Sequence, residues 1–169
     1  MGTVSGQRGW ARDAIAMTKL VAADIGGTNA RFCLAEVVDG RVASLGDPVV
    51  LPAAQYQGLA DAWRAFGEVI GEPLPRHAAI GIAGPVTGGP VRFVNSAWVV
   101  DPACLADDLG LDDFVLLNDF GAMAHAVHAL DERFFDHLCG PDAGLPQRGA
   151  ISVIGPGTGL GVAILQRLA

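Results

Sequence analysis

The 169-residue chain is 51% hydrophobic and carries a formal net charge of −7, which indicates a folded, acidic protein. The negative charge argues against non-specific binding to nucleic acid or to an anionic membrane, and no apolar run is long enough to span a bilayer. Lys19 is the only lysine, which excludes a Walker A loop because that loop needs Gly-Lys-Ser/Thr. The three cysteines form no Cys-x-x-Cys pair, which favours a reduced, cytoplasmic protein.

The first sixteen residues differ from the rest of the chain, because they show no apolar periodicity and no signal-peptide core. We expect residues 1–16 to form a disordered extension. Regular structure is expected to begin just after Met17, which would serve as a natural start.

Three strands are predicted next, at Leu20–Ile25, Ala30–Val38 and Arg41–Leu51. The dipeptide Asp39-Gly40 is a strong hairpin signal between the second and third strands. The third strand is expected to be interrupted at residues 46–48, where Gly-Asp-Pro stands. The chain is therefore predicted to open with a three-stranded meander.

Helices and strands are then predicted to alternate. Apolar spacing indicates a helix over residues 57–70 and buried strands over 78–83 and 114–117. A short strand is expected over 91–94. Asp101 and Pro102 are typical of a helix start, as N-cap and first helical residue. A helix is expected from Asp119, with an apolar stripe of Phe120, Met123, Ala124, Val127 and Leu130.

This order of elements predicts an α/β fold of the ribonuclease H-like type, the half-unit of actin-like ATPases. Residues 17–130 are assigned to this N-terminal domain. Strands are also predicted over 150–154 and 162–165, on either side of a glycine-rich turn. We expect residues 131–169 to be the opening segment of a second, larger domain that this chain does not complete, because two strands alone leave apolar faces exposed.

The first glycine-rich turn follows the first predicted strand and reads Asp24-Ile25-Gly26-Gly27-Thr28-Asn29. A plain hairpin turn would explain the two glycines. The flanking residues add a second interpretation, since glycines let backbone amides approach phosphate oxygens and Asp24 could orient a metal-bound water.

The second glycine-rich turn, Gly155–Gly161, holds four glycines and a threonine in seven residues. It is not a dinucleotide fingerprint, because the third glycine of that pattern would fall at Leu160. A hairpin does not require so many glycines, so a phosphate-binding role is favoured.

Asn118 and Asp119 follow a predicted strand at the position where ligands bind in open α/β sheets. Asp119 is also a reasonable helix cap. The two roles are compatible, and both stay open on the residues alone.

Five motifs together resemble the bacterial glucokinase family of the actin-like ATPase superfamily. They are Val21-Ala-Ala-Asp-Ile-Gly-Gly-Thr-Asn-Ala-Arg31, Ile82-Ala-Gly-Pro-Val-Thr-Gly88, Val94-Asn-Ser-Ala-Trp98, Leu117-Asn-Asp-Phe120 and Gly155-Pro-Gly-Thr-Gly-Leu-Gly161. The family usually has glycine before the first aspartate, where this chain has Ala23. The motifs appear in the family's order over almost the whole chain.

The resemblance implies phosphoryl transfer from ATP, with Mg²⁺, to the 6-hydroxyl of glucose. It implies that Asp119 is the general base and that Asp24 orients waters of the metal ion. The implied sugar-binding residues are Asn118, Asp119, Asn95, Gly84 and Pro85. The implied nucleotide-binding residues are Ala23, Asp24, Ile25, Gly26, Gly27, Thr28, Asn29, Gly157, Thr158 and Gly159.

Full-length glucokinases continue beyond the last of these motifs, with further sugar-binding and adenosine-binding segments. We therefore expect the 169-residue chain to have little or no activity alone. Two other functions stay open: a non-catalytic sugar- or nucleotide-binding remnant, and an actin- or chaperone-type ATPase. Neither a nucleic acid nor a membrane partner is expected, and a homodimer of the full-length protein is left open.

Overall fold

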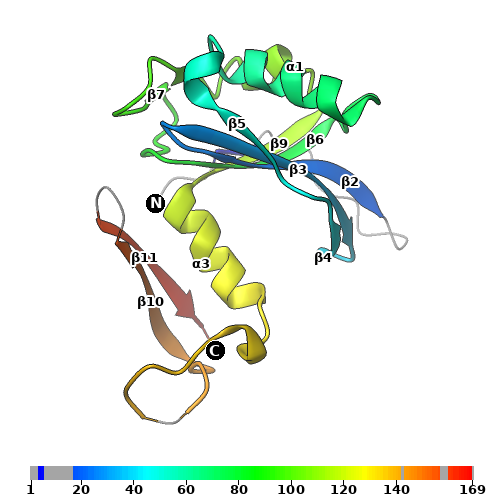
Figure 1. The fold of residues 1–169 in the computed structure, drawn as a ribbon. Helices are drawn as coiled ribbons and strands as arrows, with labels where there is room; N and C mark the ends of the chain where they lie inside the picture. The colour runs from blue at the N-terminus through cyan, green and yellow to red at the C-terminus, as the bar shows by residue number, and fades with distance from the viewer. Residues whose placement is uncertain (1–3, 6–16, 142, 157–159, 169) are drawn as a thin grey trace. The chain divides into compact units, whose positions relative to one another are not determined.

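The structure is a computed structural model that describes residues 4–5, 17–141, 143–156 and 160–168 (Figure 1). The chain divides into two compact units, an N-terminal unit of Met1–Asp119 and a C-terminal unit of Phe120–Ala169. Each unit is described by itself. In the described part of the chain, no helix is long and apolar enough to cross a membrane.

A mixed sheet of seven strands, counted over the described residues, forms the centre of the N-terminal unit. Its order is β1-β9-β6-β2-β3-β4, and β5 also pairs with β3. The strands are β1 (Val4–Ser5), β2 (Thr18–Ile25), β3 (Asn29–Val38), β4 (Arg41–Leu45), β5 (Val49–Pro52), β6 (His77–Ile82) and β9 (Asp113–Asn118).

The pairing directions follow from how the strands are connected. β2, β3 and β4 are joined by short turns and pair antiparallel, whereas β6 and β9 run parallel to β2. Asp39 and Gly40 both have positive φ, so the turn between β3 and β4 has the left-handed backbone that this dipeptide favours. The expected strand over 41–51 is two strands, because the chain leaves the sheet at Gly46–Pro48 before β5 returns to β3.

Helix α1 (Leu59–Ile70) lies across one face of this sheet, as Figure 1 shows. The sheet residues that face it alternate along each strand, as expected for a sheet buried on one side. In the core beneath α1, the ring of Phe66 stacks on Phe32 with centroids 5.3 Å apart, and Trp63 meets Phe32 edge-on at 6.0 Å. These aromatic contacts fix α1 on the strands that carry the first glycine turn.

The remaining short elements of the N-terminal unit surround that core. They are the 3₁₀ helix η1 (Ala53–Gln55), the strand pair β7 (Val91–Arg92) and β8 (Val99–Val100), and the helix α2 (Leu105–Leu109). The predicted helix start at Asp101 and Pro102 is wrong, because α2 begins at Leu105. The Asp101 side chain instead accepts a hydrogen bond from the Ala103 N–H at 3.0 Å, which forms a turn before the helix.

The C-terminal unit contains α3, which runs to Ala129 from its first residue, Asp119, and a hairpin of β10 (Gly149–Pro156) and β11 (Leu160–Arg167). The 3₁₀ helix η2 (Glu132–Phe134) follows α3. The expected apolar stripe of α3 is only partly correct. Gly121 and Ala124 are its buried residues, whereas Met123 and Leu130 are exposed.

The N-terminal segment differs in part from the expected disordered extension. Val4 and Ser5 form the strand β1, which pairs antiparallel with β9 opposite Leu116 and Val115. The rest of residues 1–16 lie outside the described residues. The described residues resume at Met17, and β2 begins at Thr18, two residues before the predicted strand start at Leu20.

Candidate functional site

The carboxyl ends of three parallel strands bring the predicted site residues of the N-terminal unit to one edge of the sheet. Ile25 of β2 pairs with Ile82 of β6, and Ile82 pairs with Asn118 of β9. A backbone hydrogen bond of 2.9 Å from Ala83 N to the Ile25 carbonyl extends this alignment past the strand ends. In open α/β sheets, this edge is where ligands bind.

The first glycine turn lies at this edge between β2 and β3. The Gly26 N–H donates to the carbonyl of Asn29 at 2.9 Å, so this amide closes the turn. Gly27 packs against Asn95: a Cβ on Gly27 would lie 3.4 Å from the Asn95 Cβ. The carbonyl of Thr28 accepts a hydrogen bond from Ala53 N at 2.9 Å, which ties the turn to η1. The turn is thus fixed by contacts with Asn29, Asn95 and Ala53.

The predicted nucleotide residues within β2 have two different environments. The side chains of Ala23 and Ile25 are buried in the core beneath α1, so only their backbone can face a ligand. Asp24 points to the opposite face, where its carboxylate pairs with Arg31 of β3 at 2.9 Å. This carboxylate is half-exposed, which is compatible with the outer-sphere metal role expected for it.

Gly84 links the loop after β6 to the end of β9. Its carbonyl accepts a hydrogen bond from the Asn118 Nδ2 at 3.0 Å. A Cβ on Gly84 would lie 2.6 Å from Val91 Cγ1, so a larger residue would push the loop away from β7. The hydrogen bond to Gly84 fixes the Asn118 amide at the sheet edge. Pro85 follows Gly84 in the same loop.

A cavity of about 400 Å³ opens between the first glycine turn and the loop after β7. Its lining residues are Gly27, Thr28, Ala53, Ala54, Tyr56, Gln57, Asn95, Ser96, Ala97 and Trp98. The cavity is therefore lined both by the turn that is predicted to bind phosphate and by Asn95, which is predicted to bind the sugar. A volume of this size suits a small polar ligand.

Trp98 forms one wall of the cavity and is fixed by three contacts. Its Nε1–H donates to the Tyr56 carbonyl at 3.0 Å, its backbone N–H donates to Ser96 Oγ at 3.2 Å, and its ring meets Phe93 edge-on. Two of these contacts come from nearby residues, and the third joins Trp98 to Tyr56, which is distant in sequence. Preorganised walls of this kind lower the entropic cost of ligand binding.

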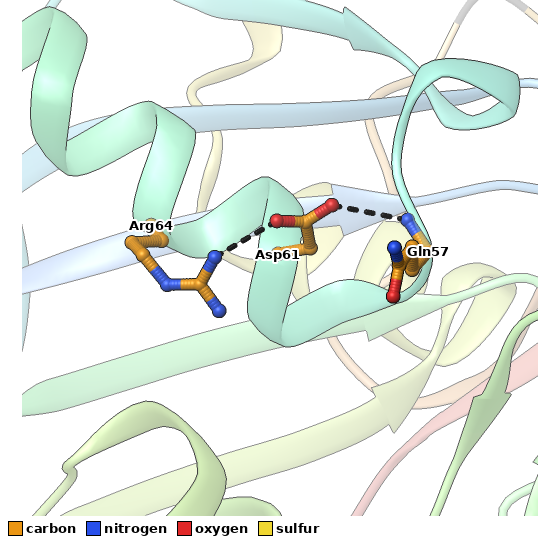
Figure 2. A network of polar contacts seen from close by, with 3 residues as sticks. All are labelled: Gln57, Asp61 and Arg64. Carbon is orange, nitrogen blue, oxygen red and sulfur yellow. Dashed lines mark hydrogen bonds and ion pairs between the residues drawn. The ribbon is translucent and has the colours of Figure 1, made fainter.

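Tyr56 and Gln57 line the cavity but carry no motif that identifies them in the sequence. Gln57 was expected within the helix, yet α1 begins at Leu59. Figure 2 shows what fixes Gln57: its backbone N–H donates to Asp61 Oδ2 at 3.1 Å, and Asp61 Oδ1 accepts from Arg64 Nη1 at 2.9 Å. An acidic residue in the first turn of the helix thus satisfies a backbone donor at the helix entry.

Asp119 stands directly after Asn118, as the first residue of α3 and the last residue of the N-terminal unit. Gly157, Thr158 and Gly159 of the second predicted phosphate turn lie outside the described residues. In the described part of the chain, no group of three His, Cys, Asp or Glu side chains is placed to hold a metal ion directly.

The two glycines that flank this second turn have a packing role. Gly155 of β10 and Gly161 of β11 are cross-strand partners. A Cβ built on either one would collide with the ring of Phe120. The phenyl ring therefore needs both glycines, which accounts for two of the four glycines without any ligand.

The cavity and the aligned strand ends belong to one α/β domain, and this edge of an open α/β sheet is where ligands commonly bind. The Glucokinase family model matches residues 21–169, and the chain therefore belongs to the glucokinase family.

Similar proteins carry the same name. The chain is 54% identical over 149 residues to a glucokinase from Zymomonas mobilis subsp. mobilis, a match that covers 88% of this chain and 46% of that protein. A glucokinase structure from an Antarctic psychrotroph has 29% sequence identity and a TM-score of 0.72, over 89% of this chain and 47% of the other.

A glucokinase from Balamuthia mandrillaris, solved in complex with glucose, shares the fold at 23% sequence identity and a TM-score of 0.67, over 93% of this chain and 46% of the other. The chain thus spans about half the length of the relatives it matches, and corresponds to their N-terminal half.

Proposed function

We propose that this chain forms the N-terminal half of a glucokinase, which transfers the γ-phosphoryl group of ATP to the 6-hydroxyl of glucose. One observation carries the proposal. A glycine turn suited to phosphate and an asparagine suited to a sugar hydroxyl line the same cavity, at the sheet edge where Asn118 is also held. The fold is accordingly interpreted as the ribonuclease H-like half of an actin-like kinase.

On the sugar side, Asp119 is the proposed general base that accepts the proton of the 6-hydroxyl as that oxygen attacks. Asn118 and Asn95 are proposed to hydrogen-bond other hydroxyls of glucose. The Asn118 amide nitrogen already donates to Gly84, which fixes the side chain before substrate arrives. Gly84 and Pro85 would form the loop beside the sugar.

On the phosphate side, the backbone amides of Gly27 and Thr28 are the proposed donors, because the Gly26 amide is used within the turn. The residues of the first turn fit such a ligand: the backbone is exposed at two glycines and fixed by hydrogen bonds to Asn29 and Ala53. Residues 157–159, which lie outside the described residues, are proposed to bind phosphate as well.

Asp24 is proposed to orient waters of Mg²⁺, which would neutralise charge on the phosphates during transfer. Its half-exposed carboxylate fits this role, and the ion pair with Arg31 holds it in place. A reaction that consumes ATP places the proposed enzyme in the cytoplasm.

A non-catalytic sugar- or nucleotide-binding remnant is the second candidate. The observation that favours it is length, since the chain covers 46% of its relative from Zymomonas mobilis. A phosphoryl-transfer site depends on excluding water and positioning both substrates, and half of a cleft does neither. We therefore expect the purified chain to show almost no glucose phosphorylation in a coupled assay; normal turnover would contradict this expectation.

The catalytic proposal is tested by Asp119→Asn in this chain fused to the C-terminal half of the Zymomonas mobilis glucokinase. The substitution should lower kcat by at least about a hundredfold, because general-base catalysis contributes roughly 10²–10⁴-fold. The free energy of unfolding should change by less than about 1 kcal/mol, because Asn and Asp cap helices comparably.

The matched control is Asp108→Asn, which lies on α2 away from the sheet edge and should leave kcat unchanged. A preserved kcat with a lowered unfolding temperature in Asp119→Asn would mean that Asp119 is only a helix cap. The catalytic proposal would then be abandoned.

A further inference from the structure

Gln57 lines the cavity but belongs to no motif and has no role so far. Its backbone N–H donates to Asp61. Within the described part of the chain, its side-chain amide has no hydrogen-bond partner. An amide offers two N–H donors and an acceptor oxygen, so this exposed side chain can bind a ligand in the cavity.

The chemistry of the cavity lining indicates which part of a ligand this amide meets. The polar side chains of the lining are all uncharged: the hydroxyls of Thr28, Tyr56 and Ser96 and the amides of Gln57 and Asn95. Phosphate groups are bound by cations, metal ions and backbone amides, whereas neutral amides and hydroxyls match the hydroxyls of a ligand. Beyond the backbone of the glycine turn, the cavity therefore suits the neutral, hydroxyl-rich part of a substrate.

The entry to α1 fixes the backbone that carries this amide. Figure 2 shows that one carboxylate oxygen of Asp61 accepts from the Gln57 N–H, at 3.1 Å, and the other accepts from Arg64, at 2.9 Å. One residue earlier, the Tyr56 carbonyl accepts from Trp98 Nε1 at 3.0 Å. The backbone of Gln57 is thus positioned before a ligand binds, which lowers the entropic cost of using its side chain.

We propose that Gln57 is a specificity-determining residue for the sugar, and that its side-chain amide hydrogen-bonds one hydroxyl of glucose other than the 6-hydroxyl. The inference rests on the proposed function, which identifies the ligand as a hexose and assigns the 6-hydroxyl to Asp119. A site that hydrogen-bonds a substrate hydroxyl rejects a sugar that lacks it, because the polar group of the site then loses its partner.

The test uses this chain fused to the C-terminal half of the Zymomonas mobilis glucokinase. Gln57→Leu removes the donors and the acceptor at similar size, and should raise the KM for glucose about three- to tenfold, the net worth of one such hydrogen bond. The kcat and the KM for ATP should stay within about twofold, as expected when only sugar binding is weakened. The matched control is Gln55→Leu: Gln55 is an exposed glutamine of η1 outside the cavity lining, and its substitution should change none of these constants.

Deoxy sugars identify the hydroxyl that Gln57 contacts. The KM is measured for the 1-, 2-, 3- and 4-deoxy forms of glucose with the unsubstituted fusion and with Gln57→Leu. The penalty of the substitution should vanish for one of these sugars and persist for the others, because the substitution removes nothing where the hydroxyl is already missing. A purely structural effect of Gln57→Leu would weaken the binding of every sugar equally.

Asp61→Ala tests whether the helix entry positions Gln57. It should raise the KM for glucose less than Gln57→Leu does, because the amide is loosened but not removed. In the double variant it should add almost nothing to the effect of Gln57→Leu, since Asp61 acts on the sugar only through Gln57.

Four results would overturn the inference: an unchanged KM for glucose in Gln57→Leu, an equal rise in Gln55→Leu, an equal penalty for all the deoxy sugars, or a raised KM for ATP in place of glucose. The proposed function is judged separately, by calorimetric binding of glucose to the same fusions. Gln57-dependent binding without phosphorylation supports the inference and contradicts the enzyme. Phosphorylation that does not depend on Gln57 does the reverse, and a fusion that binds no glucose contradicts both.

Discussion

The N-terminal and C-terminal units differ most in how they bury apolar side chains. In the N-terminal unit, α1 covers one face of a seven-stranded sheet, and all members of the main core cluster lie there. In the described part of the C-terminal unit, the buried apolar residues are Ala124, Ile151 and Ala163. Its large apolar residues are mostly exposed, including Ile154, Leu160, Val162 and Ile164 of the β10–β11 hairpin.

The comparison shows which unit contributes most of the folding free energy of this chain. Apolar burial contributes about 25 cal/mol per Å², so a sheet with a helix packed on it gains far more than a lone hairpin. The residues proposed to bind sugar, and the first phosphate turn, belong to the well-packed unit. We expect that unit to dominate global stability.

The largest effect is expected from Phe66→Ala in the N-terminal core. Phe66 is fully buried and stacks on Phe32, so its removal leaves a cavity and should lower the free energy of unfolding by about 3–5 kcal/mol. Urea denaturation measures the loss. The control in the other unit, Ile164→Ala, should cost less than about 0.5 kcal/mol. Equal losses would contradict the division between a packed and an uncovered unit.

Gly84→Ala should have the next largest effect, since its Cβ would meet Val91 at 2.6 Å. Overpacking of this kind costs roughly 1–3 kcal/mol. Gly89→Ala in the same loop is the control, because a Cβ there has no described atom within 4 Å. If urea denaturation shows equal stability for the two variants, the contact between this loop and β7 is not tight.

Gly161→Ala tests packing inside the C-terminal unit. The added methyl would collide with the Phe120 ring, so amide exchange in β10 and β11 should accelerate about tenfold, while exchange in β2 and β6 should not change. Adding Phe120→Ala should restore much of the protection lost in Gly161→Ala. Additive effects of the two substitutions would show that the ring does not need the glycine.

The smallest effect is expected from an exposed ion pair of the N-terminal unit. Arg76 donates to both carboxylate oxygens of Asp112, at 2.8 and 2.6 Å, and these hydrogen bonds lower the pKa of Asp112. A lowered pKa stabilises the fold above the ordinary value of about 3.8, and this contribution is lost as the pH falls through the lowered value.

Asp112→Asn should therefore be slightly less stable than the unsubstituted chain at about pH 7, and the difference in stability should shrink as the pH is lowered to about 2.5. Urea midpoints at both pH values measure this difference. A gap that stays constant, or one that widens on acidification, would contradict the lowered pKa.

Local sequence chemistry predicted several elements well. The Asp39-Gly40 turn has the left-handed backbone that these residues favour. Apolar spacing identified α1 to within two residues of its start. The helix start at Asp101 was predicted wrongly because its side chain can accept a hydrogen bond in two ways. It accepts from the Ala103 N–H in a turn, and it therefore does not cap α2.

The candidate site was predicted in its residue types but not in its connections. The sequence motifs by themselves pointed to Asn95, Gly84 and Asn118. The hydrogen bond from Asn118 to Gly84 spans 34 residues, and that from Trp98 to Tyr56 spans 42, so no local pattern reveals either. Tyr56 and Gln57 were missed as lining residues for the same reason.

The sequence by itself determined what depends on near neighbours: the strands and turns, the absence of a lysine-based phosphate loop, and the order of the glycine and Asn-Asp motifs. Only the tertiary structure decided which of these elements and motifs contact one another. It placed Asn95 against Gly27 and the Phe120 ring against Gly155 and Gly161, and it left Ile154, Val162 and Ile164 of the β10–β11 hairpin exposed. Such contacts depend on the packing of distant segments, which is set by the whole fold and by no single stretch of residues.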